Sequence, residues 1–466
     1  MKGFLRYFSI IMCLAILIGA FTACSGNQNS SEVSQSQGQA NNQPSQNDSN
    51  QNTKDTQDSG DSNEPVKIII WGGVPEENGP SALVEEFNKT HEGIVAEYVR
   101  FVNDETGNTK LDTALLSGEQ IDVYFTYSIP IMTKRIEGGM AEDLSNFDAD
   151  TFVKENIGEE GVFKYDNKYY SIPTAKEPYY IMLNKAIFDE LGIDIPTEWT
   201  VDEYREICKK LVDESGDKKR YAIHGYLDLP RMVLGDNYWY KADAQESNFD
   251  DPIFAQSYQL YHDMMYEDGS AFPYTEVLAR KMEAYAQDLF LTEEVAMMLS
   301  APWHLRYVRD TESYPHDWVA TFAPLPVLEK GKEYYNLGTL NNWIMMNSKS
   351  EHKEAAWEFI KYWLTDGSKF LLAGGKVPVW KDVDLDEVTE GLLGDNAEAL
   401  FDVEAFKRVA LDPNLKYILD TETVAAPEID QIIKEESDKM YLGEQSVEEM
   451  VQSLKQRADK AIKDAQ

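Results

Sequence analysis

Residues 169–185 read YYSIPTAKEPYYIMLNK, and the rest of the chain can be interpreted outward from this stretch. A short apolar strand pattern enters a rigid turn at Pro173, because proline fixes its own backbone angle φ. Glu177 follows, and the aromatic pair Tyr179 and Tyr180 comes directly after it. Aromatic rings cover the apolar faces of a polyhydroxylated ligand while a carboxylate accepts hydrogen bonds from its hydroxyl groups. We therefore expect a hinge and part of a binding cleft here, with one of the two tyrosines packed inward.

The length and charge of the chain restrict its class of function. At 466 residues it exceeds the size of one compact core, so two or three domains are expected. The formal net charge of −39 argues against nucleic acid, which a basic face binds, and against wide contact with an anionic membrane surface. The charge indicates a solvated acidic exterior and leaves small-molecule ligands open.

The three cysteines have different surroundings. Cys13 lies in an N-terminal apolar run, Cys24 lies just after it, and Cys208 is the one cysteine in the body of the chain. A single thiol cannot form an internal disulfide, so the fold must depend on its core. Cys208 shares an apolar helix side with Tyr204 and Leu211, which predicts a buried core thiol rather than a nucleophile.

The N-terminus has the pattern of a secretory signal. Lys2 and Arg6 precede an apolar run that ends in small residues before Cys24, which predicts a signal peptide over residues 1–23. The run is short for a membrane span, which needs about 20 residues. Cys24 resembles the acylated cysteine of a bacterial lipobox, although Phe21 stands where leucine is usual; an uncleaved helix is the alternative. Residues 24–64 are almost free of apolar side chains, which predicts a disordered linker.

The next part of the chain alternates strand and helix patterns. Strands are expected at 66–71, 94–101 and 121–125, with a helix from about Ser81 and another that stops at Gly118. Short links between such elements predict a doubly wound parallel sheet of the α/β class. Ligands bind at the carboxyl ends of the strands in these sheets, which favours Trp71, Tyr124 and Tyr127 as candidates. Core packing is the alternative for Trp71.

Capping signals predict further elements. The capping box Thr200 to Glu203 predicts a helix that closes near Gly216, and the box Ser446 to Glu449 predicts the last helix. Ser350 is expected to cap another helix, and residues 341–343 are expected to precede a strand. Residues 238–240 are consecutive aromatics, so at least one of them should reach a surface or a ligand.

Several segments together resemble one family. They are SGEQIDVYF, KYYSIP with LNKAIFDELGI and TEWT, FLTEEVAMMLSAPW, APLPV, and SKSEHKEAAWEFIKYWLTD, in this order along the chain. Residues 66–462 resemble the extracellular solute-binding proteins of bacterial ABC importers, in the carbohydrate-binding group that includes maltose-binding protein. The resemblance implies a two-lobed periplasmic-binding-protein-like fold, each lobe a sheet flanked by helices, joined by a hinge and closing around a sugar.

The resemblance also implies lobe boundaries. Crossings are expected near Glu177, near residues 324–326 and near residues 373–375. The N-lobe would comprise 65–176 plus 327–372, and the C-lobe 177–326 plus 373–466.

The same resemblance assigns site residues. It aligns Glu177 with a ligand-contacting acid of the family and Trp303 with a sugar-stacking tryptophan. At Thr126 the family has an aromatic residue, so Tyr124 or Tyr127 would substitute for it. The full candidate set combines rings with carboxylate and amide groups: Glu177, Trp303, Trp71, Tyr124, Tyr127, Tyr179, Trp239, Asn341, Asn342 and Trp343.

The family resemblance and the lipobox-like N-terminus together imply a binding protein outside the cytoplasm, lipid-anchored through Cys24 to the outer face of the cell membrane. It would capture a sugar or oligosaccharide and deliver it to the membrane permease subunits of an ABC transporter, as a monomer without a cofactor, a metal or nucleic acid. One alternative keeps the fold but binds a polyamine, peptide or metal chelate.

A secreted glycosidase is the enzyme alternative, because the chain is rich in carboxylates. Glycoside hydrolysis needs two acids at a defined separation, and nothing ties a second acid to Glu177. The sequence holds no HExxH pair, GxSxG elbow or phosphate loop. Residues 382–386 hint at a calcium loop, but Glu387 and Leu393 stand where glycine and the bidentate glutamate belong. We therefore expect no enzyme activity.

Overall fold

The computed structural model describes residues 64–159, 161–216, 218–282 and 286–466. These residues belong to one compact unit, Ser62–Gln466. The predicted signal peptide, Cys24 and the predicted linker up to Asn63 lie outside the described residues. A search of the described helices finds none that is long and apolar enough to cross a membrane.

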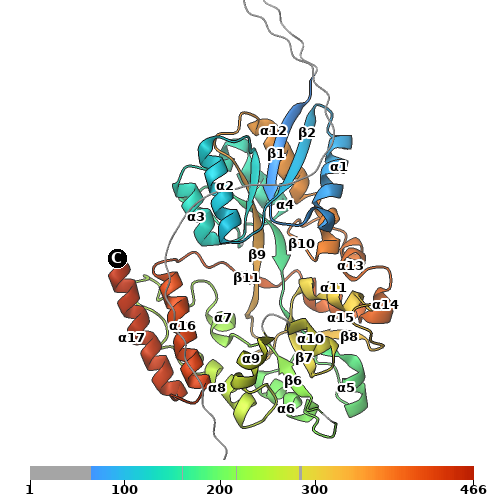
Figure 1. The fold of residues 1–466 in the computed structure, drawn as a ribbon, viewed down its shortest axis with the longest axis vertical. Coiled ribbons are helices and arrows are strands. Elements are labelled where there is room, and N and C mark those ends of the chain that lie inside the picture. Colours follow the sequence, from blue (N-terminus) through green and yellow to red (C-terminus); the bar gives the residue numbers. More distant parts are fainter. Residues whose placement is uncertain (1–63, 160, 217, 283–285) are drawn as a thin grey trace, which may run out of the picture. The chain divides into compact units, whose positions relative to one another are not determined.

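The described residues form two sheets with helices on their faces (Figure 1). The first sheet has the order β10-β4-β9-β3-β1-β2, and β11 also pairs with β9. Its strands are β1 Val66–Gly72, β2 Ile94–Arg100, β3 Val123–Thr126, β4 Ile172–Glu177, β9 Tyr335–Met346, β10 Val377–Pro378 and β11 Lys416–Ile418. β1 pairs in parallel with β2 and β3, as predicted, whereas β9 runs antiparallel to β3 and β4. The sheet is therefore mixed.

Successive side chains of a strand point to opposite sides of the sheet, so both faces of the first sheet carry apolar side chains. Helices cover both of these faces. Ile70 and Phe125 pack on one side with α1, α4 and α12. Trp71 and Tyr124 pack on the other side with α2 and α3. The elements around this sheet are η1 Glu76–Asn78, α1 Pro80–Thr90, α2 Glu105–Ser117, α3 Ile129–Glu137, η2 Leu144–Phe147, α4 Ala149–Asn156, α12 Lys353–Leu364 and η5 Ser368–Gly374.

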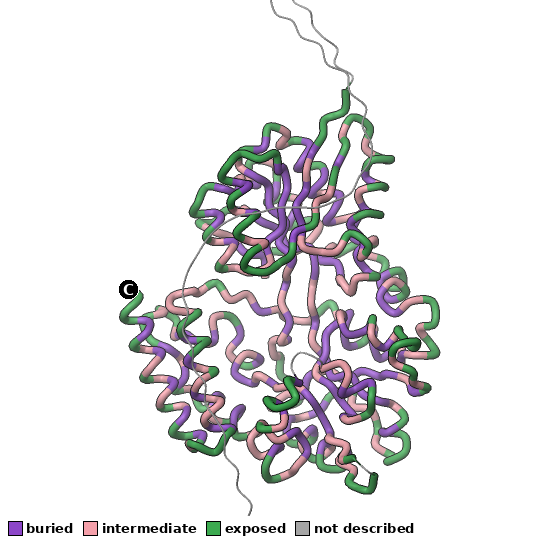
Figure 2. Tube along the Cα trace, in the orientation of Figure 1, coloured by how far each residue is buried: buried purple, intermediate pink, exposed green. Residues whose placement is uncertain are grey.

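The second sheet has the order β6-β7-β5-β8. Its strands are β5 Tyr180–Asn184, β6 Tyr221–His224, β7 Val295–Ser300 and β8 Ala320–Ala323. The sheet is buried between two groups of helices (Figure 2), and Ile181 and Met182 of β5 belong to different core clusters. The remaining helices are α5 Lys185–Leu191, α6 Val201–Leu211, α7 Leu229–Leu234, α8 Pro252–Tyr266, α9 Tyr274–Arg280, α10 Ala286–Leu291, η4 Pro302–His304, α11 Leu305–Arg309, α13 Leu385–Leu393, α14 Ala397–Leu400, α15 Val403–Ala410, α16 Ala426–Tyr441 and α17 Val447–Ala465.

Both predicted capping boxes are present, at the N-termini of α6 and α17. The predicted end of the first was wrong: α6 stops at Leu211, because Val212 is extended and Asp213 pairs with Arg220. The predicted cap of α12 was also wrong. His352 precedes that helix, and the Ser350 hydroxyl instead donates a hydrogen bond to Asp122 Oδ1 at 2.6 Å.

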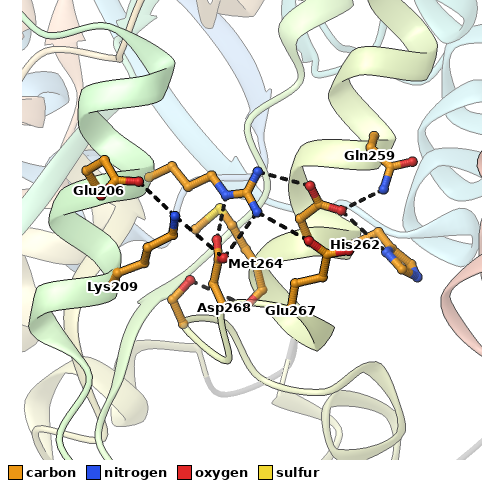
Figure 3. A network of polar contacts seen from close by, with 10 residues as sticks. Glu206, Lys209, Gln259, His262, Met264, Glu267 and Asp268 are labelled. Atoms are coloured by element: carbon orange, nitrogen blue, oxygen red, sulfur yellow. Dashed lines mark hydrogen bonds and ion pairs between the residues drawn. The ribbon is translucent and has the colours of Figure 1, made fainter.

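Polar contacts fix α6 to the end of α8 (Figure 3). Arg205 donates from Nε to Asp268 Oδ2 at 2.5 Å and from Nη1 to Asp263 Oδ2 at 2.9 Å. Lys209 Nζ lies 3.7 Å from Asp268 Oδ1 (Figure 3). On the inner side of α6 the Cys208 thiol is free and buried, as predicted, and burial raises its pKa.

The chain passes between the sheets near two of the crossings that the resemblance implies. β4 ends at Glu177 in the first sheet and β5 begins at Tyr180 in the second. After β8 the chain returns to the first sheet at β9, and Trp199 Nε1 donates to the Pro324 carbonyl at 2.7 Å on the way. β10 also pairs with β4 in the first sheet. The lobe boundaries themselves stay a prediction.

Candidate functional site

Glu177 and Asn341 form a polar pair on one face of the first sheet. Glu177 ends β4 opposite Thr339, and Asn341 lies two residues further along β9. The Asn341 Nδ2 group donates to Glu177 Oε2 at 2.6 Å, and both residues are half-buried. Asn341 Oδ1 is buried and has no hydrogen-bond partner among the described residues. The pair therefore combines a carboxylate with an acceptor that a ligand hydroxyl could satisfy.

The expectation that residues 341–343 precede a strand was wrong, since they lie inside β9. The strand begins at Tyr335, and its first residues alternate between half-buried and buried positions. Asn336 and Gly338 lie on the buried face, and Thr339 lies on the half-buried face, so no apolar run marks this part of the strand. The additional length carries Asn341 to a position beside Glu177.

Lys376 lies beside Glu177, and Trp303 packs against the residue before Lys376. Val377 of β10 is paired with Lys176 of β4, which brings Lys376 level with Glu177. Burial lowers the pKa of Lys376, the Glu177 carboxylate opposes this shift, and Arg306 adds to it. A Cβ atom at Gly375, where φ is +77°, would lie 3.2 Å from the Trp303 Cα, so this turn and η4 are in close contact.

Trp303 is a half-buried side chain packed on a buried histidine. It lies in η4, and its ring centroid is 3.3 Å from that of His304 and 6.5 Å from that of Tyr307. His304 Nδ1 and the Ser300 hydroxyl are 2.7 Å apart. Burial lowers the pKa of His304 to about 3, with contributions from Arg306 and His224. A neutral imidazole is therefore in contact with the Trp303 ring.

We expect His304 to make the protein less stable in mild acid. In the unfolded chain His304 has its ordinary pKa of 6.5. Between pH 6.5 and about 3 the unfolded chain therefore binds a proton at His304, and the folded protein does not. Stability from this group is complete above pH 7 and should fall by about 2 kcal/mol between pH 7 and pH 5. Urea denaturation at both pH values measures it in the parent and in His304→Gln, which keeps an amide for Ser300. An equal loss in the two proteins would contradict the assignment.

Tyr179 links the Glu177 pair to a second group of polar residues. Asn336 of β9 holds its backbone, accepting from the Tyr179 N–H and donating to the Tyr179 carbonyl, each at 2.8 Å. Burial raises the pKa of the Tyr179 hydroxyl, the Glu177 charge raises it further, and Arg231 opposes the shift. The hydroxyl is therefore within electrostatic range of both charged groups.

Arg231 and Trp239 line a cavity of about 190 Å³. Arg231 lies in α7, and its Nη2 is 3.0 Å from Asp420 Oδ2. Burial raises the pKa of Asp420, against the effect of Arg231. The lining comes from four separate segments of the chain: Pro130, Arg231, Asn237, Tyr238, Trp239, Tyr240, Asp420, Glu422, Thr423 and Ala426.

Other predicted site residues lie in or beside the core. Trp71, Tyr124 and Trp343 are buried in the cluster under α2 and α3. Asn342 is buried, has a φ of +52°, and accepts from Thr174 through its carbonyl. Tyr127 is half-buried and its hydroxyl accepts from the Gly73 N–H at 2.6 Å. Their ligand roles stay predictions, and the structure gives each a packing role.

The candidate list omitted Arg231, Lys376, Asp420 and Glu422. Arg231 precedes the aromatic run at residues 238–240, so an arginine close to consecutive aromatics was an available signal. Lys376 follows two glycines, which marked a close backbone approach. Asp420 and Glu422 lie in an irregular polar segment with no pattern that distinguishes them from solvated acids.

The chain matches the family model described as bacterial extracellular solute-binding protein over residues 74–370. Curated relatives include a maltotriose-binding protein of Pyrococcus abyssi, 24% identical over 59% of this chain and 58% of the relative. An arabinooligosaccharide-binding protein of Halalkalibacterium halodurans is 24% identical over 46% of each chain. The matches thus span about half the length of these two relatives.

Solved structures show the same fold. A sugar transporter protein of Rhizobium etli in an open conformation has a TM-score of 0.70 at 20% identity, covering 85% of this chain and 99% of that one. The sugar-binding protein MalE of Xanthomonas citri has a TM-score of 0.66 at 20% identity, with coverages of 86% and 98%. The family and these relatives are named as binding or transport proteins rather than enzymes. The chain belongs to the bacterial extracellular solute-binding protein family.

Proposed function

We propose that this protein captures a sugar or oligosaccharide in a cleft between two lobes and delivers it to the permease of an ABC transporter. The observation that carries the proposal is the Glu177–Asn341 pair, which joins a carboxylate to a buried unpaired amide oxygen at the point where the chain passes between the sheets. Trp303 is half-buried and packs against Gly375, the residue before Lys376, which supports an aromatic ring on the same side of the site as the pair.

The charges around the pair favour a neutral polyol. Lys376 stands level with Glu177 across β4 and β10, so the carboxylate already has a cation nearby. A polyamine would need acids without such a counter-charge. The names of relatives, which include maltotriose-binding and arabinooligosaccharide-binding proteins, support the same ligand class.

The proposal includes a location and an anchor. The family description places its members outside the cytoplasm. We propose that Cys24 carries the lipid that holds a monomer at the outer face of the membrane, with residues 24–64 as a flexible tether. Mass spectrometry of the mature N-terminus checks this, and an unmodified cysteine would contradict it.

A thermal-shift screen with spermidine and with neutral mono- and oligosaccharides tests the ligand class. A true ligand at 100 times its Kd should stabilise the folded protein by about 2.7 kcal/mol and so raise its melting temperature. We expect a shift with at least one carbohydrate, no shift with spermidine, and no release of new reducing ends. A shift with spermidine alone would exclude the sugar, and turnover would favour a glycosidase.

A further inference from the structure

The cavity beside Arg231 has the size of a single sugar ring. Its volume is about 190 Å³. An engineered protein cavity of about 150 Å³ accepts one benzene molecule. The space therefore admits one six-membered ring with substituents and is too small for a chain of rings. An oligosaccharide bound elsewhere in the site could therefore place only one of its sugar units in this cavity.

Trp239 is the aromatic side chain that this cavity leaves available. Its neighbours are buried and their hydroxyls are engaged: Tyr238 donates to Asp228 Oδ2 at 2.8 Å, and Tyr240 donates to the Val424 carbonyl at 2.9 Å. Trp239 is half-buried between these two anchored residues. Its ring is thus held in place with part of its surface free to stack on a pyranose.

The polar lining has both fixed acceptors and an unused donor. Asp420 is held by Arg231 Nη2 at 3.0 Å and by the Asn237 N–H, which donates to its Oδ1 at 2.8 Å. Arg231 Nε is buried and has no hydrogen-bond partner within the described part of the chain. A buried donor without a partner costs free energy that a ligand hydroxyl would recover. Such a donor beside a carboxylate suits adjacent hydroxyl groups, which donate and accept.

The charge of the lining selects against anionic sugars. The Arg231 charge is already paired with Asp420, and Glu422 adds a further carboxylate. Glu422 Oε1 accepts from the N–H groups of Thr423 and Val424, which fixes it in its own turn. No uncompensated cation lines the cavity among the described residues. A uronate would meet like charge there, whereas a neutral hexose would not.

The cavity wall at α7 packs against β9, the strand that contains Asn341 and also holds Tyr179. The pKa of the Tyr179 hydroxyl, raised first by burial, also responds to Glu177 and to Arg231. The packing agrees, since a Cβ atom at Gly235, just after α7, would lie 2.4 Å from the ring of Tyr335 at the start of β9. Asn336, next in β9, clamps the Tyr179 backbone.

We infer that the Trp239 cavity receives a second, neutral hexopyranose ring of an oligosaccharide whose first ring lies against Glu177 and Trp303. The inference rests on the proposed function and narrows it: the ligand has at least two sugar units and carries no charge on the unit near Arg231. Specificity for the number of sugar units in the ligand then arises from residues on α7, from the aromatic run that follows α7 and from residues 420–426.

Titration calorimetry of two tryptophan variants tests the inference. The probes are maltose, cellobiose, lactose and raffinose, their component monosaccharides, and digalacturonate as the anionic disaccharide. We expect at least one neutral oligosaccharide to bind tenfold or more tightly than its component monosaccharides and than digalacturonate. Trp239→Ala should abolish that advantage while changing the monosaccharide Kd less than twofold. Trp303→Ala, the matched control, should weaken monosaccharide and oligosaccharide together.

A second variant distinguishes loss of the sugar contact from misfolding of Trp239→Ala. Arg231→Lys keeps a cation for Asp420 but lacks the Nε donor, and we expect a fivefold or greater loss for the oligosaccharide alone. Equal Kd values for mono- and oligosaccharides, or equal losses in Trp239→Ala and Trp303→Ala, would overturn the second subsite while leaving sugar binding intact. Absence of binding by every carbohydrate would overturn the proposed function as well.

Discussion

Glu177→Ala is expected to weaken ligand binding by about 1–3 kcal/mol, which corresponds to a five- to 150-fold rise in Kd. The substitution removes the acceptor for Asn341 Nδ2 at 2.6 Å, and that amide already has a buried oxygen without a partner. It also removes the negative charge that opposes the lowering of the Lys376 pKa. Both polar groups would then face the ligand unpaired. Titration calorimetry with the tightest carbohydrate from the screen measures the change.

Two variants separate charge from hydrogen bonding at this position. Glu177→Gln keeps an oxygen that can accept from Asn341, so it should retain part of the affinity if hydrogen bonding dominates. Glu92→Ala removes an exposed acid between α1 and β2 and should leave Kd unchanged. A Kd for Glu177→Ala within twofold of the parent would mean that Glu177 does not contribute to ligand binding. Residues 169–185 would then only connect the two sheets.

The fold was predictable where strands are continuous apolar runs. β1 was predicted from such a run, and capping boxes marked the starts of α6 and α17. The first half of β9 was missed because only one of its faces is buried. Whether a ring at a strand end faces core or solvent also depends on helices that pack later in the sequence. Trp71 and Tyr124 are buried by α2 and α3, which the strand pattern alone does not reveal.

The site was predictable only where one stretch of sequence carries it. Glu177 and Tyr179 stand within three residues of each other and could be selected together. The turn predicted at Pro173 was wrong, because Pro173 lies inside β4 and is paired with Trp343 of β9. Asp420 reaches Arg231 because Asn237, at a φ of +56°, accepts from the N–H groups of Thr421 and Glu422. That arrangement arises from hydrogen bonds between the Asn237 side chain and the backbone of a distant loop, which leave no periodic pattern.

Arg135→Met is expected to lower the free energy of unfolding by about 3–5 kcal/mol, the largest change in stability that we predict. The guanidinium is fully buried and donates to Asp112 Oδ1 at 2.8 Å, to Thr126 Oγ1 at 2.6 Å and to Asn108 Oδ1 at 2.9 Å. These bonds join α2 and α3 to the end of β3. Methionine fills much of the space but leaves the Asp112 carboxylate, 14% exposed, without its principal partner. Urea denaturation measures the loss.

The adjacent lysine gives the matched control, because Lys134 Nζ lies 3.4 Å from the same Asp112 carboxylate while its side chain is 72% exposed. Lys134→Met should change stability by less than about 1 kcal/mol, as exposed ion pairs do. If the uncompensated carboxylate causes most of the loss, Asp112→Asn combined with Arg135→Met should recover part of it. Equal stabilities for Arg135→Met and Lys134→Met would mean that the buried network merely fills space. The end of β3 would then be held by apolar packing of Tyr124 and Phe125 alone.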